Sequence, residues 1–318
     1  MKLRTLGKSG INVAPLAFGG NVFGWTIDQA TSFGLLDAFT AEGFNLIDTA
    51  DAYSVWVPGH QGGESETIIG HWLKARGNRD KVVLATKVGW EMADGQKGLA
   101  KDYILKSVEG SLKRLQTDYI DLYQSHKDDP NTPLEETLEA YDQLIKQGKV
   151  RAIGASNFSA ERLKSALETA QKQNLPLYQS LQPEYNLYQR QGFEQELEPL
   201  CQEQGLGVIS YYSLASGFLT GKYRSEADLG KSPRGGGVKK FLNERGFAIL
   251  KALDQVAGQH QATPAQVSLA WLMARPSITA PIASATSLEQ LNDLIQAAHL
   301  TLTSENIELL NQASAYSN

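Results

Sequence analysis

The sequence is informative first for what it lacks. Among 318 residues it has a single cysteine, Cys201, which excludes an internal disulfide framework and a zinc site built on cysteines. No uninterrupted apolar run reaches about 18 residues, and no apolar stretch follows the charged N-terminus, so we expect neither a membrane span nor a secretory signal. These absences predict a soluble protein of the reducing cytoplasm.

An excess of charge of one sign is also missing. The 30 lysines and arginines and the 35 aspartates and glutamates give a formal charge of −5, and no segment is rich in basic residues. Because nucleic acids and anionic membranes attract basic patches, we expect neither as a partner. His60, His71, His260 and His299 show no metal-ligand spacing, so we predict no metal site.

The chain instead alternates short apolar runs with longer amphipathic ones. The apolar runs are rich in Val, Ile, Leu and Tyr, as is typical of strands that are covered on both faces. We expect strands at residues 15–20, 45–49, 81–89, 119–126, 150–157, 180–186, 207–214 and 278–285. We expect helices at residues 28–43, 64–76, 102–115, 134–147, 159–173, 193–204 and 263–275. Several of these helices open on a start signal, such as Thr263 followed by Pro264.

This alternation predicts an α/β fold, a (β/α)8 TIM barrel that residues 1–318 form as a single domain. Two β-prone stretches around residues 7–10 predict an N-terminal β-hairpin that closes the barrel floor. Two long glycine-containing loops, residues 54–65 and 225–240, are expected at the C-terminal face. Loops of this length in a compact domain are more often functional than incidental.

Four side chains with acid–base chemistry stand at the ends of three consecutive predicted strands. Asp48 ends the second strand and Tyr53 follows it, Lys87 ends the third, and His126 ends the fourth. For each residue alone, a solvated strand end explains the position equally well. A parallel barrel, however, directs the carboxyl ends of its strands to one face, so we expect the four groups to share one site.

These four groups suit one kind of chemistry. A free phenol has a pKa of about 10, and a neighbouring ammonium favours the phenolate and lowers that pKa. We expect Lys87 to act in this way on Tyr53, with Asp48 holding the ammonium in place. We expect His126 to hydrogen-bond a carbonyl oxygen as it gains negative charge. The set therefore predicts proton transfer to an alkoxide during hydride transfer.

Several stretches resemble the signature motifs of the aldo-keto reductases. They are, in order, "IDTADAYS", "ATKVG", "YQSHKDD", "VRAIGASNFS", "QPEYNLYQR" and "YYSLASGFLTGKY". The resemblance covers essentially the whole chain, and it is nearest to the bacterial branch near the potassium-channel β-subunits and the general stress reductases. It implies a TIM barrel that reduces aldehydes or ketones with NADPH and without a metal.

The resemblance also implies roles for the four groups. Tyr53 is the proton donor, Lys87 and Asp48 set its pKa, and His126 orients the carbonyl. On this interpretation both acids of "DTADAY", Asp48 and Asp51, lie with the Tyr53 phenol at the end of a strand, next to the reacting groups.

A nicotinamide coenzyme is expected because side chains cannot supply a hydride. No GxGxxG follows a strand, so a doubly wound dinucleotide site is not indicated. The resemblance implies that Ser156, Asn157 and Gln182 hold the carboxamide and that the ring stacks on Tyr211. Residues 213–223 would wrap the pyrophosphate, with an ordinary glycine-containing turn as the alternative. The further contacts implied in this way are Gly20, Asn21, Ser213, Leu214, Ala215, Gly217, Leu219 and Lys222.

The sequence departs from the family pattern in two places. Where relatives often read "YSPL", this chain reads "YYSL". Relatives that prefer NADPH often carry Lys or Arg after the last strand, where this chain has Ser284, Thr286 and Gln290. Because a 2′-phosphate bears about two negative charges, Arg234 is our candidate for its cation. We expect NADP(H) as the cofactor, with NAD(H) as the alternative.

Other interpretations stay open. Lys87 lies on a barrel strand, as the lysine of a Schiff-base aldolase does, although a carboxylate partner would keep it charged and non-nucleophilic. The resemblance also permits a cofactor-sensing regulatory subunit. For a reductase, Trp25, Trp56 and Trp90 either line an apolar pocket for a small carbonyl substrate or serve ordinary loop packing. A monomer is the default expectation.

Overall fold

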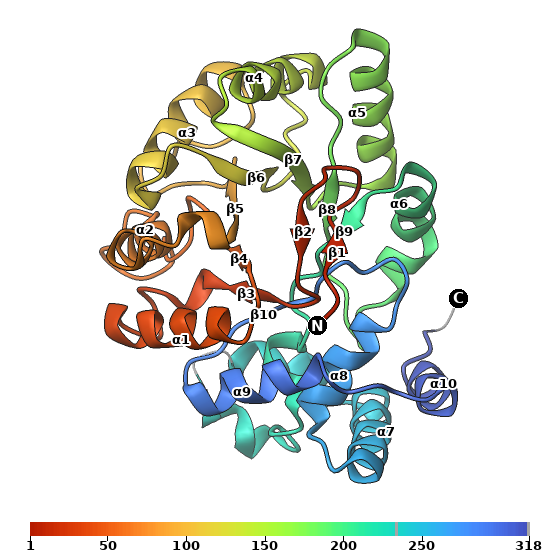
Figure 1. Cartoon of the computed structure of the whole chain (residues 1–318). Coiled ribbons are helices and arrows are strands. Elements are labelled where there is room, and N and C mark those ends of the chain that lie inside the picture. Colours follow the sequence, from red (N-terminus) through yellow and green to blue (C-terminus); the bar gives the residue numbers. More distant parts are fainter. Residues whose placement is uncertain (233–234, 317–318) are drawn as a thin grey trace.

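Eight parallel strands form the centre of the protein, in a computed structural model that describes residues 1–232 and 235–316 (Figure 1). The strands are β3 (Ala17–Gly19), β4 (Leu46–Asp48), β5 (Val83–Val88), β6 (Ile120–Ser125), β7 (Val150–Ser156), β8 (Ser180–Gln182), β9 (Gly207–Val208) and β10 (Ile282–Ala283). They pair in the order β10–β3–β4–β5–β6–β7–β8–β9. The two outer strands also meet, because the amide of Thr279, just before β10, donates to the carbonyl of Val208 in β9 at 2.8 Å. The sheet therefore closes, which confirms the predicted TIM barrel.

Helices surround these strands (Figure 1). They are α1 (Gln29–Ala41), α2 (Glu64–Arg76), α3 (Lys101–Leu115), α4 (Leu134–Lys146), α5 (Ala160–Gln173), α6 (Glu198–Gln204), α7 (Glu244–His260), α8 (Pro264–Met273), α9 (Leu288–Ala297) and α10 (Ser304–Ala313). The seven predicted helices are confirmed, except that the one at 193–204 begins with a π-helical turn, η3 (Phe193–Leu197). Helices α7, α9 and α10 were not predicted from the sequence. Of these, α7 packs against both α8 and α10.

Capping side chains explain where several helices begin. The Ser159 side chain accepts from the amide of Arg162 at the start of α5. Thr263 and Gln266 form a reciprocal capping box at the start of α8, with Pro264 at the first helical position. In the described parts of the chain, no helix is both long and apolar enough to cross a membrane.

The N-terminal hairpin closes one end of the barrel. Strands β1 (Arg4–Thr5) and β2 (Asn12–Val13) pair antiparallel, which confirms the predicted hairpin. Apolar residues of the hairpin pack against the interior side chains of the barrel strands in one buried cluster: Leu6, Ile11, Val13, Leu46, Ala85, Leu122, Ala152, Ile209 and Ala280. A side chain at Gly7 would collide with the carbonyl of Gln179, so the hairpin turn lies directly against the sheet.

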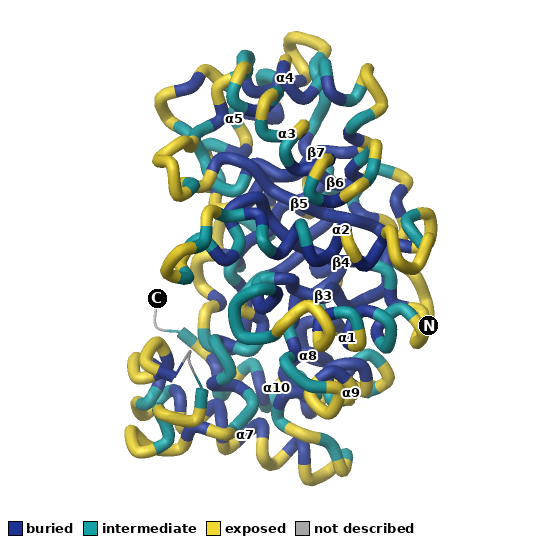
Figure 2. The backbone as a smooth tube through the Cα atoms, turned by 90° about the vertical axis from the view of Figure 1, so that its left-hand side faces the viewer, coloured by how far each residue is buried: buried dark blue, intermediate teal, exposed yellow. Residues whose placement is uncertain are grey.

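The remaining core lies between the strands and the helices. Figure 2 shows the strands as the buried centre of the molecule, with exposed residues on the outer faces of the helices and on loops. Every residue of β5 and β6 is buried, because one face packs inside the barrel and the other packs under helices. Since the hairpin fills one end, a ligand can approach the strands only from the carboxyl ends.

Candidate active site

A cleft of about 890 Å³ opens at the carboxyl ends of the strands. Its walls come from the loops that follow almost every strand, as expected for a barrel of this kind. Asp48, Tyr53 and His126 line it at one end, and Gln290 and Leu294 belong to the lining contributed by α9. The residues that were predicted from successive strand ends are thus brought together in one space.

Lys87 lies under this cleft and joins two of the other predicted residues. Its side chain is 0% exposed. The ammonium donates three hydrogen bonds, to Asp48 Oδ2 at 2.7 Å, to the Thr49 carbonyl at 2.8 Å and to the Tyr53 hydroxyl oxygen at 2.8 Å. Burial lowers the pKa of Lys87, and the neighbouring carboxylate of Asp48 opposes that shift. All three ammonium protons therefore have partners, and two of those partners, Asp48 and Tyr53, line the cleft.

The carboxylate of Asp48 is fixed from several sides. Besides the ammonium, its Oδ1 accepts from Gln182 Nε2 at 2.9 Å and from Gln124 Nε2 at 3.3 Å. Gln124 was missed by the sequence analysis, although a glutamine inside an otherwise apolar strand is a detectable signal. These bonds satisfy a charge that is only 1% exposed, so the acid stays in place beneath the cleft.

His126 follows β6 and lies beside the phenol. The ring centroids of Tyr53 and His126 are 5.9 Å apart, and the Trp90 ring lies 5.0 Å from the imidazole on another side. Burial, and then the charges of Lys87 and Lys127, lower the pKa of His126 well below its usual value. The imidazole is therefore neutral at neutral pH. Its Nδ1 is buried and has no hydrogen-bond partner among the described residues, and His126 is part of the lining of the cleft.

Asp51 has a different environment from the one that we expected. It lines a second cavity, of about 290 Å³, together with Arg114. Burial and the nearby charge of Glu66 raise the pKa of Asp51 well above its usual value. Only one of the two acids in "DTADAY" therefore faces the reaction space, because the loop after β4 turns the second side chain toward helix α3.

The residues expected to hold a nicotinamide lie next to the phenol. Ser156, Asn157, Gln182 and Tyr211 all line the cleft. The Tyr211 hydroxyl donates to Asn157 Oδ1 at 2.7 Å, and Asn157 Nδ2 donates to the His126 carbonyl at 2.9 Å. The aromatic face of Tyr211 and these amides form a continuous surface, which suits a flat ring that carries a carboxamide.

The other predicted contacts divide into three groups. Those that line the cleft are Asn21, Ser213, Leu214, Gly217, Lys222, Ser284, Thr286 and Gln290. Three others, Gly20, Ala215 and Leu219, are buried behind the lining. Arg234 lies outside the described residues. Ser216 and Thr220, within the stretch predicted to wrap the pyrophosphate, also line the cleft, and so do residues that were not predicted, among them Lys231, Ser232 and Asp293.

Strained backbone is concentrated in the loops around the cleft. Ser54, Asn157, Tyr212, Ala215 and Ser216 all have positive φ, between 47° and 75°, although none is a glycine. Such conformations are unfavourable for residues with a Cβ, and they persist where the surrounding structure holds them. Four of them lie in loops that carry predicted coenzyme contacts, and Ser54 follows the predicted proton donor, Tyr53.

The three tryptophans of the loops lie together at the mouth. Trp56 and Trp90 line the cleft and are 47% and 42% exposed, respectively. Trp25 packs edge-on against Trp56, with ring centroids 5.5 Å apart. Two of the three therefore form apolar walls for a ligand, and the third supports one of those walls.

The sequence is similar to those of known proteins over nearly its whole length. A sequence model of the aldo/keto reductase family matches residues 15–315. The chain is 36% identical to the uncharacterized oxidoreductase YrpG of Bacillus subtilis, with 98% of this chain and 95% of that protein covered. It is 35% identical to the aldo-keto reductase YhdN of the same organism, with 95% and 89% covered. A probable voltage-gated potassium channel subunit beta of Arabidopsis thaliana is 33% identical, with 93% and 91% covered. The chain therefore belongs to the aldo/keto reductase family.

Proposed function

We propose that the protein reduces aldehydes or ketones to alcohols with NADP(H), with Tyr53 as the general acid. One observation carries the proposal: the Lys87 ammonium donates to the Asp48 carboxylate and to the Tyr53 phenol oxygen at the same time, beneath an open cleft. Membership of a family of oxidoreductases that use nicotinamide coenzymes supports it.

Each residue has a role that follows from its contacts. When bound, the nicotinamide supplies the hydride that no side chain can provide. Tyr53 donates its proton to the carbonyl oxygen as that oxygen becomes an alkoxide. The hydrogen bond from Lys87 stabilises the phenolate that remains, and Asp48 holds the ammonium. His126, as a neutral imidazole, donates through Nε2 to the same oxygen and so orients the carbonyl.

The charges of the cleft support NADP(H). Lys222 and Lys231 both line it, Lys231 in an ion pair with Asp228 at 2.7 Å, and an ammonium attracts a phosphate. The carboxylate of Asp293, which also lines the cleft, accepts hydrogen bonds from Thr263 and Gln266. Ser284 and Thr286 also line the cleft, where their hydroxyls donate to Asn21 Oδ1 at 2.7 Å and to Gln290 Oε1 at 3.0 Å. Arg234 stays our candidate for a further cation. Titration with NADPH and with NADH, followed by quenching of tryptophan fluorescence, tests this preference.

Two other functions can be distinguished from reduction. A Schiff-base aldolase is disfavoured because the Lys87 amine is buried and donates three hydrogen bonds, so it is no free nucleophile. Borohydride with a carbonyl substrate should leave Lys87 unmodified. A coenzyme-sensing regulatory subunit is supported by the likeness to the Arabidopsis channel subunit beta. Very slow turnover, tight coenzyme retention and a co-purifying partner would favour that function instead.

The decisive variant is Tyr53→Phe. It removes the proton donor and keeps the ring, so we expect turnover of a reactive aldehyde to fall about 10²–10⁴-fold. Tyr123→Phe is the matched control, since the Tyr123 hydroxyl is buried in the core and has no hydrogen-bond partner among the described residues. The control should keep wild-type turnover. A Tyr53→Phe protein with wild-type turnover would refute the proposal.

A further inference from the structure

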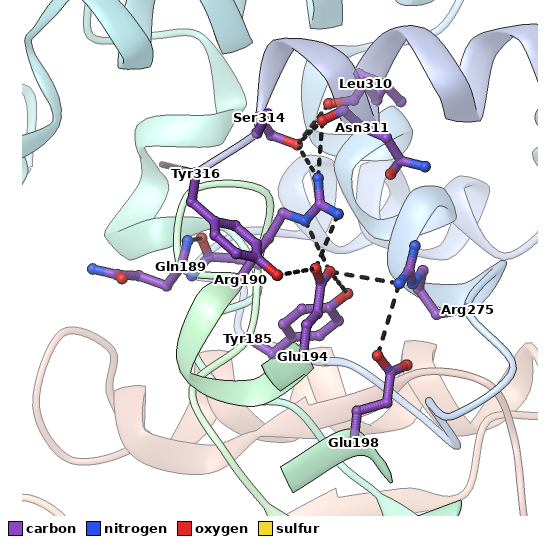
Figure 3. Close-up of polar contacts among 12 residues, drawn as sticks. Tyr185, Gln189, Arg190, Glu194, Glu198, Arg275, Leu310, Asn311, Ser314 and Tyr316 are labelled. Carbon is purple, nitrogen blue, oxygen red and sulfur yellow. Dashed lines mark hydrogen bonds and ion pairs between the residues drawn. The ribbon is translucent and has the colours of Figure 1, made fainter. Parts of the chain in front are cut away.

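A second buried ion pair, Arg190–Glu194, contacts residues 311–316 at the C-terminal end of the chain. Arg190, in the loop after β8, is 9% exposed. Its guanidinium donates to both carboxylate oxygens of Glu194, at 2.8 Å and 3.0 Å. The same group donates to the carbonyl of Asn311 at 3.0 Å and to Ser314 Oγ at 2.8 Å (Figure 3). The guanidinium therefore ties the loop after β8 to the end of helix α10.

Glu194 is the centre of this group of contacts. It accepts from the Tyr185 hydroxyl at 2.7 Å and from the Tyr316 hydroxyl at 3.3 Å, and Arg275 lies at 3.5 Å (Figure 3). Burial alone would raise the pKa of this carboxyl, but the hydrogen bonds from Arg190 and Tyr185 outweigh it and leave the pKa below its usual value. The carboxylate is therefore charged at neutral pH and holds the C-terminal segment through Tyr316.

A second arginine makes the same connection from helix α7. Arg245 donates to the carbonyl of Tyr188 at 2.8 Å, to that of Ser314 at 2.7 Å and to that of Ala315 at 2.9 Å. Cations at the C-terminus of a helix satisfy its last carbonyls and its dipole. Both arginines thus link the loop after β8 to residues 311–315 at the end of α10.

That loop also supports the residue expected to stack on the nicotinamide. The amide of Tyr211 donates to the carbonyl of Pro183 at 2.9 Å. Asn186 Nδ2 donates to the carbonyl of Tyr212 at 3.0 Å, and Tyr212 has a left-handed backbone with φ of 52°. Such a backbone needs outside support to persist. The position of the Tyr211 ring therefore depends on residues 183–190.

We propose that Arg190, Arg245, Glu194 and residues 311–316 form a C-terminal clasp that positions the Tyr211 face of the coenzyme site. The proposal rests on the proposed function, since it assigns Arg190 as a positioning residue for coenzyme binding. The clasp acts through polar bonds to residues 183–190, while the apolar core remains complete without it. Loosening it therefore opens this loop locally and leaves the barrel folded.

Arg190→Gln is the principal test. We expect NADPH to bind about tenfold more weakly, because coupling between a supporting segment and a site is typically of that size. The KM for NADPH should rise while kcat at saturating coenzyme changes little. Hydrogen exchange in the coenzyme-free protein should become faster at residues 183–189 and 211–213. Ser314→Ala, a smaller change, should move all three readouts in the same direction.

Arg79→Gln is the matched control. Arg79 also forms an ion pair with a buried acid, Asp121, at 2.8 Å, but it lies before β5 at the opposite end of the barrel. Its loss should lower the thermal midpoint without changing NADPH affinity or exchange at residues 211–213. A merely structural Arg190 would behave like this control, and that result would overturn the proposal.

The test also separates the clasp from the function on which it rests. If the wild-type protein binds neither NADPH nor NADH, the proposed function fails. Exchange at residues 211–213 in the coenzyme-free protein still decides the clasp: faster exchange in Arg190→Gln but not in Arg79→Gln supports it. Unchanged exchange at these residues in both Arg190→Gln and Ser314→Ala overturns it.

Discussion

The pairs Lys87–Asp48 and Arg190–Glu194 are both buried salt bridges. They differ in the groups to which the two cations donate their other hydrogen bonds. The Lys87 and Asp48 side chains are 0% and 2% exposed, and those of Arg190 and Glu194 are 10% each. The lysine donates one of its three hydrogen bonds to a phenol that lines the cleft. The arginine donates only to groups that hold two segments of the chain together.

Burial of an ion pair therefore does not identify a reaction site. Desolvation makes such pairs weak evidence for stability, and breaking one by removing a partner is strongly destabilising. What distinguishes the Lys87 pair is a third, proton-bearing group, Tyr53, between the charge and the cleft. The neutral His126 beside it adds a hydrogen-bond donor at the same point.

The largest expected effect comes from breaking the first pair with Lys87→Met. Turnover should fall about 10²–10⁴-fold, because the phenolate loses its ammonium. The free energy of unfolding should also fall by about 3–5 kcal/mol, because Asp48 is left as an unpaired buried charge. Steady-state kinetics and urea unfolding measure the two losses.

A double variant separates these two losses. Adding Asp48→Asn to Lys87→Met should restore much of the stability and none of the turnover. Recovery of activity in the double variant would contradict the role given to the ammonium.

Breaking the second pair should lower stability but leave turnover nearly unchanged. Glu194→Gln leaves Arg190 without its carboxylate, so we expect the free energy of unfolding to fall by about 3 kcal/mol. Turnover at saturating coenzyme should stay within about twofold of wild type, since no reacting atom is touched. The same unfolding and kinetic assays apply. A loss of turnover as large as that of Lys87→Met would erase the distinction between the two pairs.

The smallest expected effect is a pH dependence of stability that arises from His126, next to the first pair. The pKa of His126 is depressed in the folded protein, so below the unfolded value of about 6.5 the unfolded chain binds more protons than the folded one. Stability should therefore decline as the pH falls below about 6.5, and this part of the decline should be absent in His126→Gln. Thermal midpoints of both proteins at pH 5 and pH 7.5 measure the difference. Parallel pH profiles would show that the imidazole is not held neutral.

The sequence was sufficient for the barrel and for the four central residues. Apolar runs that end in polar residues placed Asp48, Lys87 and His126 on one face, since parallel strands share their direction. Three helices were left unassigned even though Asn243, Ser287 and Thr303 cap them, because the assignments relied mainly on apolar periodicity. The position of Lys231 in the cleft was not predicted either, because it lies in a short helical turn of the long glycine-rich loop at 225–240.

Other features could not be deduced in this way. Asp48 and Asp51 are three residues apart, and only the path of the loop after β4 decides that one faces the cleft and the other faces Arg114. The contact between Arg190 and Ser314 joins positions 124 residues apart. No pattern of neighbouring residues in the sequence predicts a contact over such a separation.

The amino-acid sequence by itself indicated the order of the strands, seven of the helices and the chemistry available at the carboxyl ends of the strands, because periodicity and strand direction are local properties. The tertiary structure alone decided which acid of "DTADAY" faces the cleft and which residues at the end of the chain Arg190 reaches. Those contacts depend on distances between segments far apart in the chain, which are fixed only when the whole barrel packs.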